Sequence, residues 1–260
     1  MADQTRARQA GAHMWEARRS GAVYANLPAA LGPADIDEAY AAQAEFHRLA
    51  APVYGPLGGW KIATTTKVMQ ELMGIDHPCA GAIFASRIHR SPARIRAADY
   101  VSLKLECELA FRLAVDLPPS RAPFDAAQMQ GSVESIMPAF ELVDDRHAVY
   151  RDTAAWSLIA DNAWNAGIVL GEARPLSAIP LLAELGGSLE IAGKPRLEGK
   201  ADRPLEALAW IANLTAKQGE GLRRGMVVMT GSLIPTKPIA AGETALFQVP
   251  GLGEVRLQVD

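Results

Sequence analysis

Apolar and polar residues alternate over a short run in the middle of the chain, and this period of two predicts a β-strand. Glu106 and Glu108 are two residues apart, so their side chains point to the same face of that strand. The apolar residues on the opposite face are Leu105, Cys107, Leu109 and Phe111. We therefore expect a strand that buries one face in a core and presents two carboxylates on the other.

Helical patterns occupy the front of the chain and recur further on. The predicted helices cover residues 3–19, 33–49, 67–73, 125–135 and 204–217. In the second of these, Ile36, Tyr40, Ala44 and His47 fall on one stripe that is expected to pack. His47 at helical spacing is more typical of a packed or surface residue than of a ligand. Residues 52–59, rich in Pro and Gly, are expected to form a loop.

Short apolar runs bounded by turn-forming residues predict strands in the remainder of the chain. They cover residues 60–63, 138–143, 186–191, 194–197, 225–229, 245–248 and 253–259, with a hairpin turn at 192–193. Residues 84–96 favour a strand and a loop with a solvated basic face. Together these elements predict an α+β fold in a single domain, residues 1–260, with a helical N-terminal segment (1–57) and a β-rich core (58–260).

Composition narrows the class of protein. The 260 residues are 49% hydrophobic and 21% charged, which is ordinary for a globular protein. A net charge of −3 gives no reason to expect nucleic acid as a partner. Cys79 and Cys107 form no CxxC motif, which favours a reduced, cytoplasmic protein. The charged N-terminus lacks the apolar run of a signal peptide, and we expect no membrane association.

A third carboxylate, Glu141, lies in another apolar run, residues 138–143. Three carboxylates on apolar strands suit a hard divalent cation such as Mg²⁺, which prefers oxygen ligands and keeps some of its waters. The same pattern also fits a strand with one wet face and ordinary surface glutamates. Lys104 shares the face of Glu106 and Glu108 and could neutralise one of them.

Other polar residues are candidates for ligand contacts. Lys61 lies between large apolar neighbours, where a lysine must reach solvent or find an anion. Asp161 and Asn162 should be hydrogen-bonded if they are buried. Residues 230–233 end a buried strand with small hydroxyl residues, a frequent place for ligand contacts that turns also use. The triplet 144–146, Asp-Asp-Arg, is typical of a solvated turn with local ion pairs.

From about residue 58 to the C-terminus, the chain resembles the fumarylacetoacetate hydrolase superfamily. The resemblance is strongest to its 2-keto-4-pentenoate hydratase and 4-oxalocrotonate decarboxylase branch. Five segments occur in the family's order and rough spacing. They are Gly59-Trp60-Lys61-Ile62 with Thr65 and residues 67–70, Glu106-Cys107-Glu108-Leu109-Ala110-Phe111, residues 138–144, Ala160-Asp161-Asn162, and Thr230-Gly231-Ser232-Leu233.

The resemblance implies a rolled, mixed β-sheet core of the C-terminal type of that superfamily, with flanking helices and homo-oligomers. It also implies a metal-dependent lyase of aromatic catabolism that acts on small 2-oxo acids or their dienols. The implied ligands of Mg²⁺ (or Mn²⁺) are Glu106, Glu108 and Glu141. Implied substrate contacts come from Lys61, Thr65, Thr230 and Ser232. Lys61 is the implied active-site lysine, and Asp161 belongs to the supporting shell of the catalytic site.

Three departures from the branch affect the choice of reaction. Cys79 stands where hydratases carry a proton-transfer acid, Ala63 replaces a glycine, and Asp202-Arg203 replaces Gly-His. Hydration of 2-hydroxypenta-2,4-dienoate to 4-hydroxy-2-oxopentanoate is the first expectation, and 4-oxalocrotonate-type decarboxylation is a close alternative.

Two other functions remain as alternatives. Hydrolysis of a C–C bond in an acylpyruvate would use a His-Glu pair, for which Glu71 and His77 are weak candidates. A non-catalytic partner subunit in a hydratase–decarboxylase complex is the alternative from another class.

Overall fold

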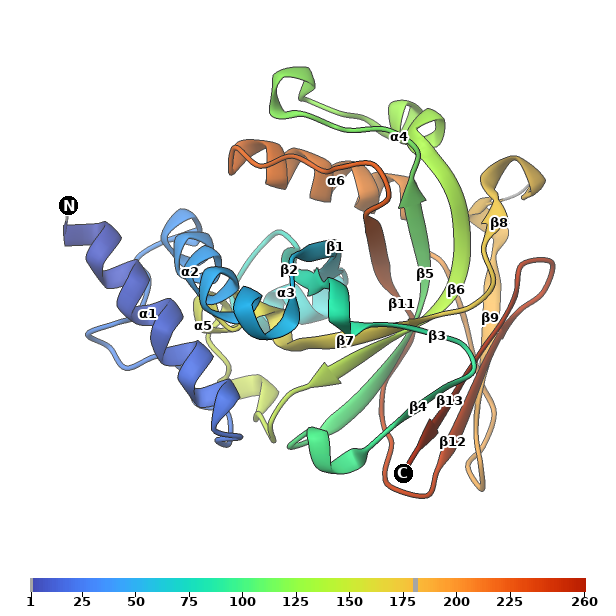
Figure 1. The fold of residues 1–260 in the computed structure, drawn as a ribbon, viewed down its shortest axis with the longest axis horizontal. Coiled ribbons are helices and arrows are strands. Elements are labelled where there is room, and N and C mark those ends of the chain that lie inside the picture. Colours follow the sequence, from blue (N-terminus) through green and yellow to red (C-terminus); the bar gives the residue numbers. More distant parts are fainter. Residues whose placement is uncertain (1, 180–181) are drawn as a thin grey trace.

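The computed structural model describes residues 2–179 and 182–260. Helices α1 (Ala2–Arg19) and α2 (Ile36–Tyr54) lie side by side at one end of the molecule (Figure 1). They approach closely because Gly11 has no side chain: a Cβ there would lie 2.2 Å from the carbonyl oxygen of Ala42. Trp15 packs edge-on against Phe46, with ring centroids 5.6 Å apart. Both N-terminal helices are thus present as predicted.

The second helix differs from its prediction in length and in its buried face. It continues past residue 49 and through Pro52 to Tyr54, so only residues 55–56 of the expected loop at 52–59 lie outside a helix or strand. The new strand already begins at Leu57. Ala44 is exposed, whereas Gln43 and Phe46 are buried. The buried stripe follows the contact with α1, which the apolar pattern of α2 alone does not specify.

A large mixed sheet of eight strands forms the centre of the fold. Its strands are β1 (Leu57–Ala63), β2 (Cys79–Phe84), β3 (Ile88–Arg90), β5 (Leu103–Leu113), β6 (Val133–Asp144), β7 (Asn165–Leu170), β8 (Arg174–Pro175) and β11 (Val227–Pro238). Their order is β2-β1-β11-β5-β6-β7-β3, with β8 paired to β6. The β1–β11 and β3–β7 pairs are parallel, and the other pairs are antiparallel. Long strands β5 and β6 bend strongly, which gives the sheet its rolled form (Figure 1).

A second sheet of five strands packs beside the first. In order, it contains β10 (Leu197–Lys200), β9 (Gly186–Ile191), β12 (Thr244–Val249), β13 (Gly253–Val259) and β4 (Ala93–Ile95). Phe247 of this sheet meets Phe140 of the large sheet, with ring centroids 6.2 Å apart. Both rings are fully buried, so the main core lies between the two sheets.

Within the described residues, four further α-helices flank the sheets: α3 (Lys67–Met73), α4 (Ala126–Ser132), α5 (Ala155–Ala160) and α6 (Pro204–Lys217). The bounds of α3 and α6 match their predictions. The predicted helix at 125–135 is too long, because β6 begins at Val133 and pairs there with Leu113. Strands β9 and β10 form an antiparallel hairpin as expected, but β10 begins at Leu197, so the predicted second strand at 194–197 shares only that residue with it. The α+β fold class with a curled mixed sheet is therefore confirmed, while the assignment of one domain stays a prediction.

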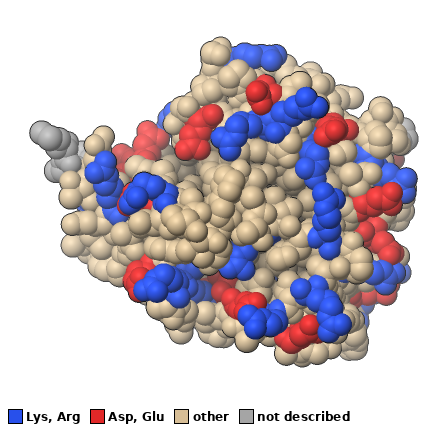
Figure 2. Space-filling model, viewed as in Figure 1, with Lys and Arg blue, Asp and Glu red and all other residues tan. Residues whose placement is uncertain are grey.

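Charged side chains of both signs are spread over the surface, as the small net charge predicts (Figure 2). On the face shown in Figure 2, basic and acidic side chains alternate around the periphery, and the centre is mostly uncharged. Within residues 2–179 and 182–260, no helix combines the length and the apolar character that a membrane span needs.

Candidate metal centre

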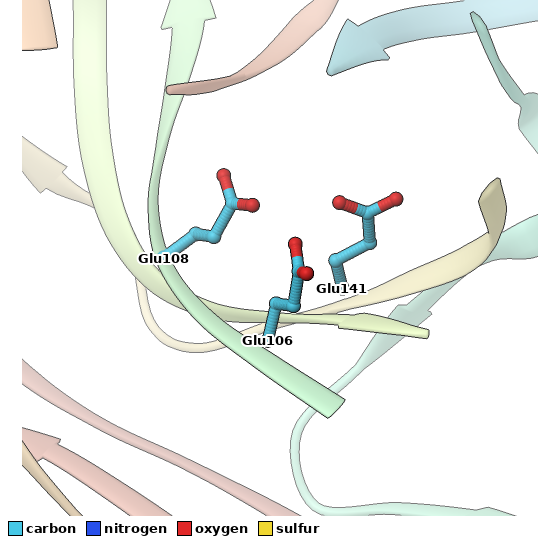
Figure 3. Close-up of side chains that lie close together, drawn as sticks. All are labelled: Glu106, Glu108 and Glu141. Carbon is cyan, nitrogen blue, oxygen red and sulfur yellow. The ribbon is translucent and has the colours of Figure 1, made fainter. Parts of the chain in front are cut away.

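Three carboxylates converge on one face of the rolled sheet (Figure 3). Glu106 of β5 pairs directly with Glu141 of β6 across the antiparallel ladder, and Glu108 lies two residues further along β5. One carboxylate oxygen from each residue can be chosen so that all lie within 4.8 Å of one another. Glu108 and Glu141 are fully buried, and Glu106 is partly exposed. The prediction that Glu106 and Glu108 share a face is confirmed.

Each carboxylate is held through one of its two oxygens. The Gly231 amide donates to Glu108 Oε2 at 2.8 Å, and Asn165 Nδ2 donates to Glu141 Oε1 at 2.9 Å. Thr236 Oγ1 donates to Glu106 Oε1 at 2.5 Å. Glu108 Oε1 and Glu141 Oε2 are buried with no hydrogen-bond partner. Because buried oxygens normally have partners, this donor set fits a cation that takes hard oxygen ligands.

Lys61 supplies one positive charge to this cluster. Its Nζ lies 3.1 Å from Glu141 Oε1, and both side chains are buried. Strands β11 and β5 lie between β1 and β6 in the sheet. The Lys61 side chain on β1 nevertheless reaches Glu141 on β6 because the sheet is rolled (Figure 1). Three carboxylates and one ammonium, when all are ionised, leave two negative charges, the charge that one divalent cation neutralises.

The pKa values of these groups reflect the same excess of negative charge over positive charge. Burial raises the pKa of Glu108 well above its ordinary value, and the neighbouring Glu141 and Glu106 raise it further. Burial also raises the pKa of Glu141, to about 7, although Lys61 opposes the shift. For Lys61, burial disfavours the charged form, but the nearby carboxylates outweigh it, and the pKa is raised. The cluster therefore carries excess negative charge when it is ionised, and binding of a cation would be favourable.

An irregular stretch of β11 makes the contact with Glu108 possible. The β11–β5 register shifts between Met229 and Ser232 and twice more further along, as at β-bulges. Gly231 has φ of +102°, and a Cβ there would lie 3.1 Å from Cγ2 of Thr65. A side chain is therefore strained at this position, and glycine turns its amide toward Glu108. Thr65, a predicted substrate contact, lies beside this turn.

The two other hydroxyl residues of β11 have backbone partners. Thr230 Oγ1 donates to the carbonyl of Leu109 at 3.1 Å. Ser232 Oγ donates to the carbonyl of Ile234 at 2.6 Å and accepts from the Cys107 amide at 3.1 Å. These contacts stabilise the irregular pairing of β11 with β5. The predicted contacts of Thr230 and Ser232 with substrate remain predictions.

Cys79 lies at the edge of the cluster. It pairs with Ala63 in the β1–β2 ladder, two residues along β1 from Lys61. Thr64 Oγ1 lies 3.5 Å from Cys79 Sγ, and the thiol is buried. Burial raises the pKa of Cys79, while Thr64 and Lys61 oppose the shift. The side chain is therefore a neutral thiol at pH 7.

Asp161 belongs to a different cluster. Arg146 Nη1 lies 3.0 Å from its Oδ2, and Arg18 Nη2 lies 3.4 Å from its Oδ1. The predicted solvated turn at 144–146 is wrong: Asp144, Asp145 and Arg146 are 7%, 3% and 1% exposed. Asp144 and Arg146 have partners far away in the sequence, such as the Ser102 amide for Asp144 and Asp161 for Arg146. Asp161 thus pairs with two arginines.

Some site contacts were missed by sequence reasoning, and one was misplaced. Asn165, Thr236 and the Gly231 amide hold the carboxylates, and no local motif marks them for this role. Lys104, expected to neutralise a glutamate, instead donates to Ser102 Oγ at 2.6 Å.

The histidine that was weighed as a ligand, His47, has its partner outside the carboxylate cluster. His47 is packed, as expected, with its Nε2 2.8 Å from Asn162 Oδ1. His89 is half-buried, and the expected solvated face at 84–96 holds only in part.

Sequence comparison finds full-length relatives. No family model matches the chain. It is 33% identical over 261 residues to the 2-keto-4-pentenoate hydratase of Paraburkholderia phymatum, covering 98% of each chain. It is 32% identical over 253 residues to the TodF product hydratase of Pseudomonas putida, covering 95% of this chain and 93% of that protein.

Structural comparison supports the same fold. The 4-oxalocrotonate decarboxylase from Pseudomonas putida G7, complexed with magnesium and adipate, superposes with a TM-score of 0.89. The match covers 98% of this chain and 97% of that chain at 21% identity. At this identity the likeness establishes the fold, and it confirms the rolled-sheet architecture that the sequence motifs predict.

Proposed function

The chain belongs to the 2-keto-4-pentenoate hydratase branch of the fumarylacetoacetate hydrolase superfamily, and from this premise we propose a divalent-metal-dependent hydro-lyase. The proposed reaction is hydration of 2-hydroxypenta-2,4-dienoate to 4-hydroxy-2-oxopentanoate. The observation that carries the proposal is the buried carboxylate cluster, in which Glu108 Oε1 and Glu141 Oε2 have no hydrogen-bond partner.

Glu106, Glu108 and Glu141 would hold the cation, with Mg²⁺ as the first candidate and Mn²⁺ as the second. When bound, the cation supplies a Lewis acid for the carboxylate and oxo groups of a 2-oxo acid. The protein holds the three carboxylates through one oxygen each, which leaves the other oxygens free to face the cation. Such fixed orientation is what a second shell of hydrogen bonds contributes to a metal site.

Lys61 is the proposed group for charge and proton transfer at the oxo end of the substrate. Its ammonium is buried beside Glu141, so it can donate a hydrogen bond to an oxygen that gains negative charge. In the net reaction, carbon 4 gains a hydroxyl from water and carbons 3 and 5 each gain a proton. The hydroxyl on carbon 2 loses its proton, which balances the addition of one water. We propose that the Lys61 ammonium donates a hydrogen bond to the oxygen on carbon 2 while that proton passes to water, and so assists its transfer.

Substrate and assembly complete the proposal. The substrate is a small 2-oxo acid or its dienol, with Thr65 beside the carboxylate cluster as a binding residue. Thr230 and Ser232 hold β11 against β5 beside Glu108 through their hydrogen bonds to the backbone of β5. Asp161 supports the site from its cluster with two arginines. We further propose a cytoplasmic homo-oligomer that can associate with a decarboxylase of the same branch.

Decarboxylation of a 4-oxalocrotonate-type substrate is the second candidate, and Cys79 favours it. The pKa of this thiol is raised by burial, and a neutral thiol is a weaker proton donor than a tuned carboxylic acid. Loss of CO₂ needs mainly the electron-withdrawing cation and oxo group. Acylpyruvate hydrolysis has less support, because Glu71 is exposed and His77 Nδ1 lies 2.8 Å from the carbonyl oxygen of Pro78.

A product assay tests the proposal directly. Purified protein is incubated with Mg²⁺ and 2-hydroxypenta-2,4-dienoate, and the products are identified by NMR. We expect 4-hydroxy-2-oxopentanoate from the parent and from Glu134→Gln, which changes an exposed glutamate of β6. Glu108→Gln should be inactive. Release of CO₂ from 4-oxalocrotonate without hydration would favour the second candidate, and no turnover of either substrate would refute an enzymatic role.

A further inference from the structure

A left-handed turn lies directly before the strand that carries Asn165. Asn162, Ala163 and Trp164 have φ values of 55°, 45° and 58°. Residues other than glycine rarely adopt this conformation, and a run of them persists only when its surroundings hold it in place. The turn ends at Asn165, whose side-chain amide donates to Glu141 Oε1 at 2.9 Å. Strained backbone therefore leads directly into a contact of the proposed metal centre.

Contacts from three separate elements hold this turn, residues 161–165. The side chain of Asn162 donates to the Ala82 carbonyl at 2.9 Å and accepts from the Ala82 amide at 2.7 Å. Asp161 is bound by Arg146. Arg18, from the last turn of α1, donates to the carbonyl of Asp161 at 3.2 Å and to that of Asn165 at 3.1 Å. Its guanidinium thus bridges the two ends of the turn.

We propose that Arg18 is a positioning residue for the metal centre, acting through Asn165. By binding both carbonyls, Arg18 fixes the turn so that the Asn165 amide meets Glu141 Oε1. With Oε1 held, Oε2 faces the proposed cation. The inference rests on the proposed function, and it makes the N-terminal helix α1 part of the catalytic machinery.

A purely structural role predicts different behaviour from a positioning role. If Arg18 only attached α1 to the core, its loss would lower stability and leave the intrinsic affinity for metal unchanged. Asp161 keeps Arg146 as a partner, so truncation of Arg18 leaves no unpaired aspartate in the interior. A cavity of about 60 Å³ already borders Arg18, Asn162 and Asn165. Truncation would add to this space the volume that the Arg18 guanidinium now fills, which is the group that added guanidinium ion would replace.

The test measures Mn²⁺ affinity by titration calorimetry at neutral pH, with the melting temperature recorded for each variant. We expect Arg18→Ala to bind Mn²⁺ about 10- to 100-fold more weakly, the range found when outer-shell partners of a metal site are removed. Millimolar guanidinium should restore much of the affinity. The matched control is Arg19→Ala, because Arg19 is exposed and pairs only with Glu16 among the contacts described. Its Mn²⁺ affinity should equal that of the parent.

Two further variants keep the inference open to refutation. Arg18→Lys retains the charge but cannot bridge both carbonyls in the same way, so it should fold and still bind Mn²⁺ more weakly than the parent. In an Asn165→Ala background, Arg18→Ala should cause little further loss of affinity, because Asn165 is the route of the effect.

Equal affinity in the parent, Arg18→Lys and Arg18→Ala would overturn this inference while leaving the proposed function intact. Full additivity with Asn165→Ala would also overturn it. A parent protein that binds no divalent cation would overturn the proposed function and this inference with it.

Discussion

Replacing Glu108 with glutamine should change stability in opposite directions with and without metal. Burial raises the pKa of Glu108 well above its ordinary 4.5, with Glu141 and Glu106 adding to the shift. A carboxyl group with a raised folded-state pKa destabilises the fold as pH rises. The free-energy cost grows by about 1.4 kcal/mol for each pH unit between its unfolded and folded pKa values.

The magnitude follows from this interval. Between pH 4.5 and pH 7, which is 2.5 pH units at about 1.4 kcal/mol each, the cost of Glu108 reaches at most about 3.5 kcal/mol. Glutamine has the same shape, keeps an acceptor for the Gly231 amide and carries no charge. In EDTA, Glu108→Gln should therefore raise the melting temperature by up to about 6 °C at pH 7. At pH 4.5 the difference should nearly vanish.

Added metal should reverse the order of the two proteins. A ligand that binds only the folded state stabilises it by about 4.1 kcal/mol at 1,000 times its Kd, which exceeds the largest cost of Glu108. The parent should gain this amount with Mn²⁺, and Glu108→Gln should gain little because one ligand is lost.

Thermal denaturation with EDTA or Mn²⁺, at two pH values, measures all of these effects. Glu134→Gln, an exposed change in the next strand, is the control and should show neither effect. A variant less stable than the parent in EDTA at pH 7 would refute the reasoning, as would full stabilisation of the variant by Mn²⁺.

Three other predictions concern the same centre. Lys61→Met should retain Mg²⁺ binding but bind oxalate more weakly and turn over more slowly; equal turnover in the variant and the parent would make the lysine structural. Metal affinity should fall as pH drops below about 7, because protons then compete for Glu141, whose pKa is raised to about 7; calorimetry at pH 6 and 8 that gave equal affinities would contradict this. Cys79→Asp should raise the rate of hydration about 10²-fold or more without changing metal affinity, since it supplies a proton-transfer acid; an unchanged rate and pH profile would mean that residue 79 does not act on the substrate.

The sequence predicted the faces of the central strand well because strand periodicity is a local property. Leu105 and Phe111 enter the core, while Glu108 faces the cluster. Register is a different matter. The direct pairing of Glu106 with Glu141 depends on how β5 and β6 align, which is set by the core that both strands enter rather than by either strand alone.

The prediction for residues 144–146 failed for a related reason. Three consecutive charged residues are usually solvated, and nothing nearby in the sequence argues otherwise. Arg146 is nevertheless 1% exposed, because its partners include Asp161 and the Ala22 carbonyl, which lies 124 positions earlier in the chain. Such burial requires partners that only the folded chain brings together. Long-range pairing of this kind is the part of the site that the sequence did not predict.

Two destabilising features of this fold meet at the carboxylate cluster. Glu108 and Glu141 are buried with unpartnered oxygens, and the turn that ends at Asn165 contains left-handed residues other than glycine. Either feature alone would lower stability without benefit in a protein that bound nothing. Both become understandable if a divalent cation neutralises the carboxylates and the turn fixes one of them toward it. The position of the strain therefore supports the metal centre independently of the family to which the chain belongs.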